Sequence, residues 1–235
     1  MTHQIQNWCQ HAAVKALQTN KHLTHAISGF NIHPNQQQTT QLKQLQQLFN
    51  LPHQVYFLKQ THGAESIELT QPLSDNFQYQ ADACYSREKG VICAIMTADC
   101  LPVLLTNNTA SFVAAVHCGW RSLYQNILIK TLQKINSKQK VKAWFGPSIC
   151  QNHYEVDSDF VTHYLAKHPY AFSAFSTIKK GKSQCDLRRL ASLQLQQLGV
   201  HDITMSDHCT FADNDYYSWR ENKTAARQAS LIWKC

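Results

Sequence analysis

The chain has 235 residues, a formal net charge of +7, and a composition that is 43% hydrophobic and 16% charged. This length is enough for one sizeable hydrophobic core and favours it over two small domains. The longest apolar runs, such as "FVAAV" and "LPVLL", are far too short to cross a bilayer, which argues against a membrane-spanning protein and a membrane partner. The first residues show no basic-then-apolar order, so we expect no signal peptide and a cytoplasmic location.

The cysteines and the basic residues indicate the state of the thiols and the kind of partner. The nine cysteines are scattered, with no C-x-x-C pair, which in an unexported chain indicates reduced thiols. Most are expected to be small buried residues, Cys150 and Cys209 among them. The positive charge favours anionic partners, but only "IKKGK" around Lys179 is dense, and no helix-turn-helix, zinc-finger or RNA-recognition motif is present. Nucleic acid is therefore not an expected partner.

Hydrophobic periodicity predicts both helices and strands along the chain. Apolar residues at positions 42, 45, 48 and 49 share one face of a helix that Pro52 ends. Residues 54–59 and 141–146 have strand character. Residues 90–97 and 111–117 are nearly continuous apolar runs, which is typical of buried strands.

After Arg121 the apolar period changes from that of a strand to that of a helix, and it continues to residue 135. A second helix is predicted from Asp157 or Ser158, and a third from Asp186, as its N-cap, to Gly199. Residues 200–205 then form a strand pattern. Because strands and helices interleave without strict βαβ alternation, we expect an α+β fold in a single mixed domain.

Three segments place a potential metal ligand at the end of a predicted strand. They are "KQTHGAES" with His62, "MTADCLPVLL" with Cys100 and "AAVHCGWRS" with His117. Gly63 and Gly119 follow two of these residues and let the backbone turn or approach a ligand closely. Two imidazoles and one thiolate suit zinc, and also copper, and leave a fourth position for water or substrate. Zinc held in this way lowers the pKa of bound water to about 7.

The spacing of these residues alone leaves other interpretations open. One is a strand-end histidine bonded to backbone beside a buried cysteine. Another is a nucleophile–base dyad of Cys100 and His117, which excludes simultaneous metal ligation by that thiolate. Cys118 points to the opposite face of its strand from His117 and is a poor candidate for either role. Asp99 could orient a metal-bound histidine or cap the turn before Cys100.

Several motifs occur together in one order: "QTHG", "ADA", "TADCLPVLL", "AAVHCGWRSL", "GPSIC…YEV" and "CT…YYSWRENKTAARQASLIW". In this the chain resembles the YfiH/laccase-domain-containing family from about residue 60 to 233, and more loosely from residue 23. The resemblance implies a single domain over residues 1–235 with layered α/β/β/α architecture. It also implies that His62, Cys100 and His117 are the zinc ligands.

The same resemblance implies an enzyme of the transferase and hydrolase classes. Its implied reactions are the phosphorolysis of adenosine, inosine and methylthioadenosine and the deamination of adenosine, with purine nucleoside and phosphate as partners. Removal of a wrongly incorporated amino acid from peptidoglycan precursors is also attributed to bacterial members. An activated water suits attack on C6 of adenosine, and phosphorolysis calls for basic residues near the metal.

Candidate substrate residues follow from the motifs. Arg121 lies four residues after His117 and is expected at the N-terminus of its helix, where backbone N–H groups favour anions. Arg220 and Arg227 match basic positions of the family's C-terminal motif. Each arginine is equally compatible with a surface salt bridge. Gln60, which opens the Q-x-H-G motif, is also expected to bind substrate.

Two features set limits on the resemblance. No histidines form the His-x-His pairs of a multicopper oxidase, so phenol oxidation would reflect copper in a zinc site. The family's T-R-x-G-G-x-S-like loop reads "THAISGFNIH" here, and Gln41-Leu42 stand where an Asn-Arg pair aligns, with Lys43 nearby. The metal set is intact while the substrate wall differs, so substrate identity is less determined than reaction class.

The sequence therefore predicts a zinc-dependent purine nucleoside enzyme in which Cys100, His117 and Arg121 are catalytic. One alternative is a cysteine-type hydrolase acting on an amide in a peptidoglycan precursor. The other is a non-catalytic metal-binding adaptor. The sequence makes no prediction of the oligomeric state.

Overall fold

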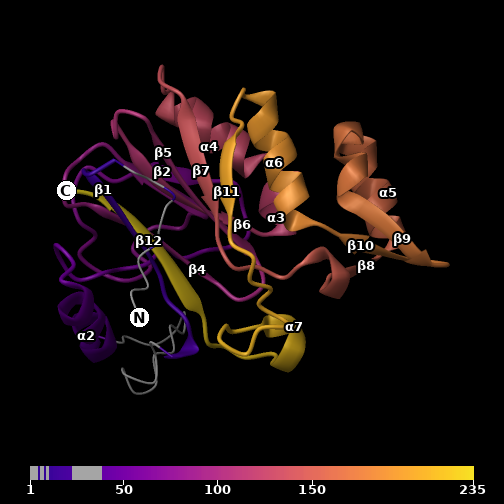
Figure 1. The fold of residues 1–235 in the computed structure, drawn as a ribbon, viewed down its shortest axis with the longest axis horizontal. Helices are drawn as coiled ribbons and strands as arrows, with labels where there is room; N and C mark the ends of the chain where they lie inside the picture. The colour runs from indigo at the N-terminus through magenta and orange to yellow at the C-terminus, as the bar shows by residue number, and fades with distance from the viewer. Residues whose placement is uncertain (1–4, 6–7, 9–10, 23–38) are drawn as a thin grey trace.

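The fold, obtained as a computed structural model, is described for residues 5, 8, 11–22 and 39–235 (Figure 1). Its strands are β1 (Val14–Gln18), β2 (Ser66–Glu68), β3 (Ala83–Ser86), β4 (Ile92–Thr97), β5 (Leu101–Asn107), β6 (Val113–Cys118), β7 (Val141–Phe145), β8 (Glu155–Asp157), β9 (Phe175–Lys179), β10 (Lys182–Cys185), β11 (Asp202–Met205) and β12 (Gln228–Lys234). Its helices are α2 (Thr39–Phe49), α3 (Trp120–Tyr124), α4 (Ile127–Ile135), α5 (Ser158–Lys167), α6 (Leu187–Gln197) and α7 (Trp219–Asn222), with 3-10 turns η1 (Gln151–His153) and η2 (Pro169–Ala174).

A six-stranded mixed sheet in the order β11-β7-β5-β6-β3-β2 forms the centre of the molecule. Every residue of β5 and β6 is buried, which explains why residues 111–117 form a continuous apolar run rather than an alternating one. The two strands pair antiparallel, with Leu101 opposite Cys118 and Pro102 opposite His117. This register places the start of β5 beside the end of β6, where the chemically interesting side chains lie.

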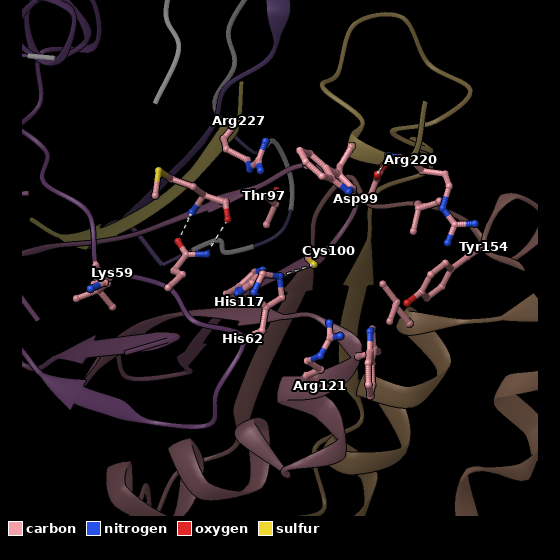
Figure 2. A pocket seen from close by; sticks show the side chains of 18 of the residues that line it. Lys59, His62, Thr97, Asp99, Cys100, His117, Arg121, Tyr154, Arg220 and Arg227 are labelled. Carbon is pink, nitrogen blue, oxygen red and sulfur yellow. Dashed lines mark hydrogen bonds between the residues drawn. The ribbon is translucent and has the colours of Figure 1, made fainter. Parts of the chain in front are cut away.

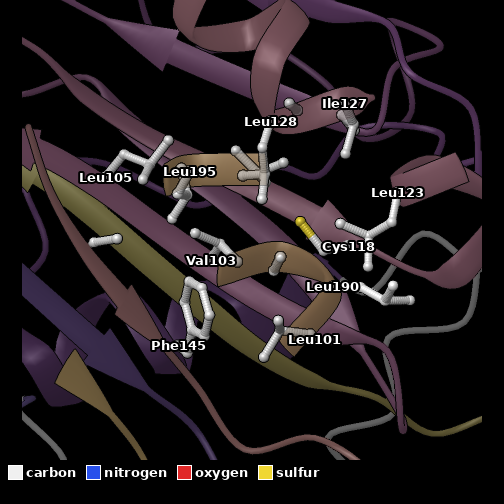
Figure 3. Close-up of a cluster of buried hydrophobic side chains, with 14 of the residues drawn as sticks. Leu101, Val103, Leu105, Cys118, Leu123, Ile127, Leu128, Phe145, Leu190 and Leu195 are labelled. Carbon is white, nitrogen blue, oxygen red and sulfur yellow. The ribbon is translucent and has the colours of Figure 1, made fainter. Parts of the chain in front are cut away.

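Successive side chains of these strands enter two different cores. Val116 and Cys118 pack on one face of the sheet with residues of α4 and α6, whereas Val113 and Ala115 pack on the other face. Figure 3 shows Cys118 among the leucines of the first core, as expected for a residue that faces away from His117. Burial also raises the pKa of the Cys118 thiol well above its ordinary value. Cys118 is therefore a core residue.

The second face of the large sheet is covered by a three-stranded sheet in the order β1-β12-β4. Cys93, Ile95 and Ile232 fill the space between the two sheets. The outer face of the small sheet packs against α2 through Leu42 and Leu45. The order of layers is therefore α2, small sheet, large sheet, and α4 with α6, which confirms the predicted α/β/β/α arrangement in a single mixed domain (Figure 1).

A third sheet, β8-β10-β9, lies beside α5 at one side of the large sheet (Figure 1). It joins the main core through an aromatic cluster in which the Tyr164 ring contacts Phe160 and Phe175. This unit positions the segment before β8, which contains Tyr154.

The structure confirms where two of the predicted helices begin. Helix α5 begins after Asp157, and α6 begins after Asp186, whose carboxylate accepts the backbone N–H of Arg189 at 3.0 Å. Gly199, just beyond α6, has a φ of 72°, which a side chain would disfavour. The predicted strand over residues 200–205 is shortened to β11.

Two predictions are wrong. Residues 54–59 form no strand, because the partners of their backbone groups are loop groups: Phe57 N–H donates to the Asn76 side chain and Lys59 N–H to the Tyr79 carbonyl. The single helix expected after Arg121 is two helices, interrupted at Asn126, whose φ of 62° is left-handed. The pattern of apolar residues does not reveal this break, because both helices bury their apolar residues in the same core.

The altered N-terminal loop, residues 24–33, lies outside the described residues. Of the two described residues near the expected Asn-Arg position, Leu42 is buried and Lys43 is exposed. Among the described parts of the chain, none of the helices combines the length and apolarity that spanning a membrane requires.

Candidate functional site

His62, Cys100 and His117 meet at one end of the large sheet. His62 comes from the loop before β2, Cys100 immediately precedes β5, and His117 lies near the end of β6. Their potential ligand atoms all lie within 4.8 Å of one another. The Cys100 Sγ is 3.8 Å from His62 Nε2, and the two imidazole rings are 4.8 Å apart between centroids, edge to face. We call these residues the His62–Cys100–His117 cluster.

A buried carboxylate, Asp82, holds two parts of this cluster in place. Its side chain accepts the backbone N–H groups of Thr61, His62 and Gly63 at 3.0, 2.9 and 2.7 Å. One of its oxygens also lies 2.7 Å from His117 Nδ1. The left-handed backbone of His62, with a φ of 59°, is thus fixed by hydrogen bonds, and the His117 ring presents Nε2 to the cluster.

Asp82 takes the orienting role for which Asp99 was a candidate. The Asp99 carboxylate accepts the Thr210 hydroxyl at 2.8 Å and the Arg220 backbone N–H at 2.6 Å, so it ties the C-terminal segment to the turn before Cys100. Orientation of a metal-bound histidine by Asp99 is therefore wrong. In the sequence, Asp82 is marked only as the one carboxylate in the short segment Ala81–Ala83. All three residues of this segment are buried in the structure.

The side chains of the cluster favour a thiolate at Cys100 beside a protonated His117. Burial would raise the pKa of the Cys100 thiol, but the facing imidazoles of His117 and His62 outweigh it and lower this pKa to about 6. Burial would lower the pKa of His117, but the Cys100 thiolate and the Asp82 carboxylate raise it to about 9. A thiolate is therefore available at neutral pH, and metal binding would displace a proton from His117.

The chemistry of the donor set fits zinc. A single thiolate with two imidazoles is a mixed N/S set of the kind zinc accepts, and it is soft enough for copper. The carboxylate behind His117 fixes the ring tautomer, as is usual for metal-binding histidines. Three protein ligands leave one tetrahedral position for a water or a substrate group.

Gly119 has no side chain, and this makes room for the side chains of His62 and Cys100. A Cβ atom at this position would lie 3.0 Å from His62 Cδ2 and 3.1 Å from Cys100 Sγ, closer than ordinary contact. A Cβ atom at Gly63 would lie 3.4 and 3.5 Å from its nearest neighbours, Thr61 and Asp82, which is ordinary contact. Of the two glycines for which the sequence predicts a close approach, Gly119 makes one and Gly63 does not.

We expect Gly119→Ala to weaken metal binding, because the new methyl group pushes His62 and Cys100 apart. Gly63→Ala is the matched control in the same cluster, since its methyl group has room. The measurement is a zinc competition titration of both variants and the parent protein. Equal zinc affinity in the Gly119→Ala variant and the Gly63→Ala control would contradict this explanation of the motif.

The cluster lies in a cavity of about 520 Å³ (Figure 2). This volume is within the range of about 300–1,000 Å³ usual for small-molecule sites. The wall includes apolar and aromatic side chains: Leu58, Phe77, Met96, Ile149, Trp120, Leu187 and Trp219. Four basic residues also line it: Lys59, Arg121, Arg220 and Arg227. Asp99 is the one carboxylate in the lining, so the cavity has a net positive charge among the described residues.

The three arginines predicted as substrate residues all line this cavity, but their guanidinium groups make different contacts. Arg121 is the second residue of α3 and stacks on the Trp120 ring at 4.3 Å. Among the described residues its guanidinium makes no hydrogen bond or ion pair. Arg220 donates to the Glu155 carbonyl from both terminal nitrogens at 3.3 Å and stacks on Tyr154 at 5.2 Å. Arg227 donates to two backbone carbonyls of its own loop, and burial lowers its pKa.

Gln60 lines the cavity, but both ends of its amide are already engaged. Its Nε2 donates to the Met96 carbonyl and its Oε1 accepts the Met96 N–H, each at 2.8 Å. The side chain therefore joins the His62 loop to the end of β4 in the manner of a strand partner. Tyr154, which the sequence analysis did not single out, also lines the cavity, and burial raises the pKa of its hydroxyl far above the ordinary value.

Comparisons with known proteins identify the family to which the chain is similar. Residues 28–235 match the family model described as "Multi-copper polyphenol oxidoreductase laccase". The chain is 38% identical over 188 residues to "Purine nucleoside phosphorylase YfiH" of Escherichia coli, covering 78% of this chain and 75% of that protein. It is 37% identical over 189 residues to a "Purine nucleoside phosphorylase" of Haemophilus influenzae, covering 79% and 76%.

Solved structures give the same result for the fold. A Neisseria meningitidis protein superposes with a TM-score of 0.82 at 31% identity, over 95% of each chain. A Bacillus licheniformis protein titled "hypothetical protein YfiH" superposes with a TM-score of 0.81 at 23% identity, which supports the fold alone. From the family-model match and these relatives, the chain belongs to the YfiH/laccase-domain family that its motifs indicated.

Proposed function

We propose that this protein is a metal-dependent purine nucleoside phosphorylase with zinc at His62, Cys100 and His117. The observation that carries this function is the position of the cluster inside a cavity that combines aromatic walls with four basic side chains. The names of the relatives at 37–38% identity support the same activity. Because the cluster needs a free thiolate, we place the enzyme in the reducing cytosol.

The cavity suits the two substrates of phosphorolysis in complementary ways. Trp120, Phe77 and Trp219 offer flat apolar surface of the kind that binds a purine ring. The basic side chains attract phosphate, and the carboxylate of Asp99 repels it little because it is already hydrogen-bonded to Thr210 and to Arg220 N–H. We infer adenosine, inosine and methylthioadenosine as the nucleosides.

In phosphorolysis a phosphate oxygen forms a bond to C1′ of the ribose while the bond from C1′ to the purine nitrogen breaks. Arg121, with no competing partner among the described residues, is the side chain best placed to take two phosphate oxygens in a fork. Tyr154 stays protonated and can donate a hydrogen bond. A zinc ion in the cluster would supply a Lewis acid beside these groups. Deamination of adenosine would use the same cavity without phosphate.

We expect Arg121→Lys to separate the two reactions. Lysine keeps the charge but loses the bidentate fork, so the phosphate KM should rise by about ten- to a hundredfold, which corresponds to about 1.5–3 kcal/mol. Deamination of adenosine should change little, because it uses no phosphate. Arg189→Lys is the matched control, since Arg189, on α6, donates a hydrogen bond to the Ser173 hydroxyl and does not line the cavity. Steady-state kinetics of both reactions provide the measurement.

An equal loss of both reactions in the Arg121→Lys variant would mean that Arg121 maintains the cavity or the cluster. Arg220 and Arg227 would then be the remaining candidates for the phosphate site.

A second candidate function is supported by one specific arrangement. Cys100, His117 and Asp82 are linked in the order nucleophile, base and carboxylate, with His117 Nδ1 2.7 Å from Asp82. This favours a cysteine-type hydrolase acting on an amide, as in a peptidoglycan precursor. A covalent acyl-enzyme on Cys100, trapped with an electrophilic amide analogue and located by mass spectrometry, would establish this function. An unmodified Cys100 in metal-free protein would exclude it.

A further inference from the structure

A second group of metal-binding side chains lies outside the cavity. The ligand atoms of Cys150, His153 and Cys209 all lie within 4.8 Å of one another, and none of these residues lines the cavity. His153 Nδ1 is 3.2 Å from Cys150 Sγ and 3.5 Å from Cys209 Sγ. The expectation that Cys150 and Cys209 are buried fillers is therefore wrong, since both are partly exposed and face a histidine.

The backbone around this group is arranged by two local structures. Cys150 is the N-cap of η1 and His153 is its last residue, and residues three apart in a 3-10 turn lie on the same side. Cys209 comes from a distant loop that pairs with Ser148 in a parallel bridge, with Thr210 N–H donating to the Ser148 carbonyl at 3.1 Å. The Cys150 N–H also donates to Cys209 Sγ at 3.2 Å.

The histidine ring is held in the orientation that faces both sulfurs. It stacks on the Phe211 ring with 4.6 Å between centroids and an angle of 24°. Phe211 lies two residues after Cys209, so the same loop supplies one sulfur and the surface that fixes the imidazole. Among the described residues this is one of two such groups, the other being the His62–Cys100–His117 cluster.

The separations match those of a shared ion. Zinc bonds of about 2.3 Å to sulfur and about 2.0–2.1 Å to nitrogen, at a tetrahedral angle, place N and S about 3.5 Å apart. The observed 3.2 and 3.5 Å lie close to this value. The spacing of the three ligand atoms is therefore that of side chains able to hold one ion between them.

We propose that Cys150 Sγ, His153 Nδ1 and Cys209 Sγ form a second zinc site, whose ion joins two loops behind the wall of the cavity. Ile149 and Tyr154, on either side of the first loop's ligands, line the cavity. Thr210, next to Cys209, donates to Asp99 beside Cys100. Its three protein ligands leave a fourth position for water, and because none of them lines the cavity, the ion would fix the wall and take no part in the reaction. It is independent of the proposed catalytic metal, because the two groups share no residue.

The test counts zinc in the 235-residue chain, in three variants of it and in one control variant. Each is stripped of metal under reducing conditions, reloaded with zinc sulfate, passed through gel filtration in metal-free buffer and analysed by plasma mass spectrometry. We expect two zinc ions per chain in the parent protein, one in Cys100→Ala, one in Cys209→Ala and none in the double variant. Cys235→Ala, which removes an exposed thiol outside both groups, is the matched control and should keep two.

A spectroscopic reading identifies the ligands in the surviving site. Cobalt(II) loaded into Cys100→Ala should give near-ultraviolet thiolate-to-metal absorption, and adding Cys209→Ala should remove most of it. His153→Ala provides a second variant that keeps both thiols, with His163→Ala as its matched control and circular dichroism as the check on folding. Loss of zinc from folded Cys100→Ala/His153→Ala supports the site.

Other outcomes overturn the inference. If Cys100→Ala retains no zinc, the second group binds no metal. The same holds if folded Cys100→Ala/His153→Ala retains as much zinc as Cys100→Ala. A Cys150–Cys209 disulfide in protein prepared under reducing conditions would replace the metal site by a redox pair. None of these results bears on the catalytic metal, which Cys209→Ala reports separately.

Discussion

Replacing Cys100 by alanine should abolish phosphorolysis and empty the His62–Cys100–His117 cluster of zinc. The thiolate is the one anionic ligand of this set, and its pKa of about 6 means that it is ionised when metal binds at neutral pH. Without it, two imidazoles remain, which is too few for a stable site. Since a catalytic metal contributes several kcal/mol to transition-state stabilisation, kcat/KM should fall by about three orders of magnitude or more.

The zinc content of this variant is best measured in the Cys209→Ala background, so that only the catalytic cluster contributes. Cys235→Ala is the control for the loss of a thiol as such, and it should retain full activity. Full zinc content and full activity after Cys100→Ala would show that the cluster is not the catalytic metal site.

Asp82→Asn should destabilise the fold and weaken metal binding together. Asparagine keeps the shape of the side chain but has one acceptor oxygen, whereas Asp82 accepts the three loop N–H groups and faces His117 Nδ1. At least one buried donor is then left unpaired. The free energy of unfolding should fall by about 2–5 kcal/mol and zinc affinity by about 10–100-fold.

Urea denaturation measures the first effect and a zinc competition titration the second. Asp159→Asn is the matched control: this carboxylate is exposed on α5, and its loss should change stability by no more than about 0.5 kcal/mol. If Asp82→Asn binds zinc as tightly as the parent protein, Asp82 does not orient His117 for metal binding.

Much of the architecture follows from local sequence patterns. The apolar runs at 90–97 and 111–117 form strands that are buried on both faces, because two sheets and two helical layers enclose them. Burial on both faces is what makes their sequences continuously apolar. Asp186 and Gly199 mark α6 because caps are local hydrogen-bond and backbone effects. Cys100 and His117 lie at strand ends, as their segments predict, whereas His62 lies in a loop because residues 54–59 form no strand. The role of all three as metal ligands stays a proposal.

Other features depend on contacts between distant segments, which local patterns do not record. Residues 54–59 resemble a strand, yet their hydrogen-bond partners come from residues 76–79 in a loop. Asp82 acts on His117 because β3 and β6 are neighbours in the sheet. Cys209 meets Cys150 through the bridge at Ser148, although 59 residues separate them.

The most direct test of the central claim is the activity of protein from which all metal has been removed and shown by elemental analysis to be absent. Phosphorolysis of inosine and adenosine should be lost in this protein and return in proportion to zinc added, up to one ion per chain in the Cys209→Ala variant. Phosphorolysis that continues at the original rate in verified metal-free protein would contradict a catalytic metal at His62, Cys100 and His117.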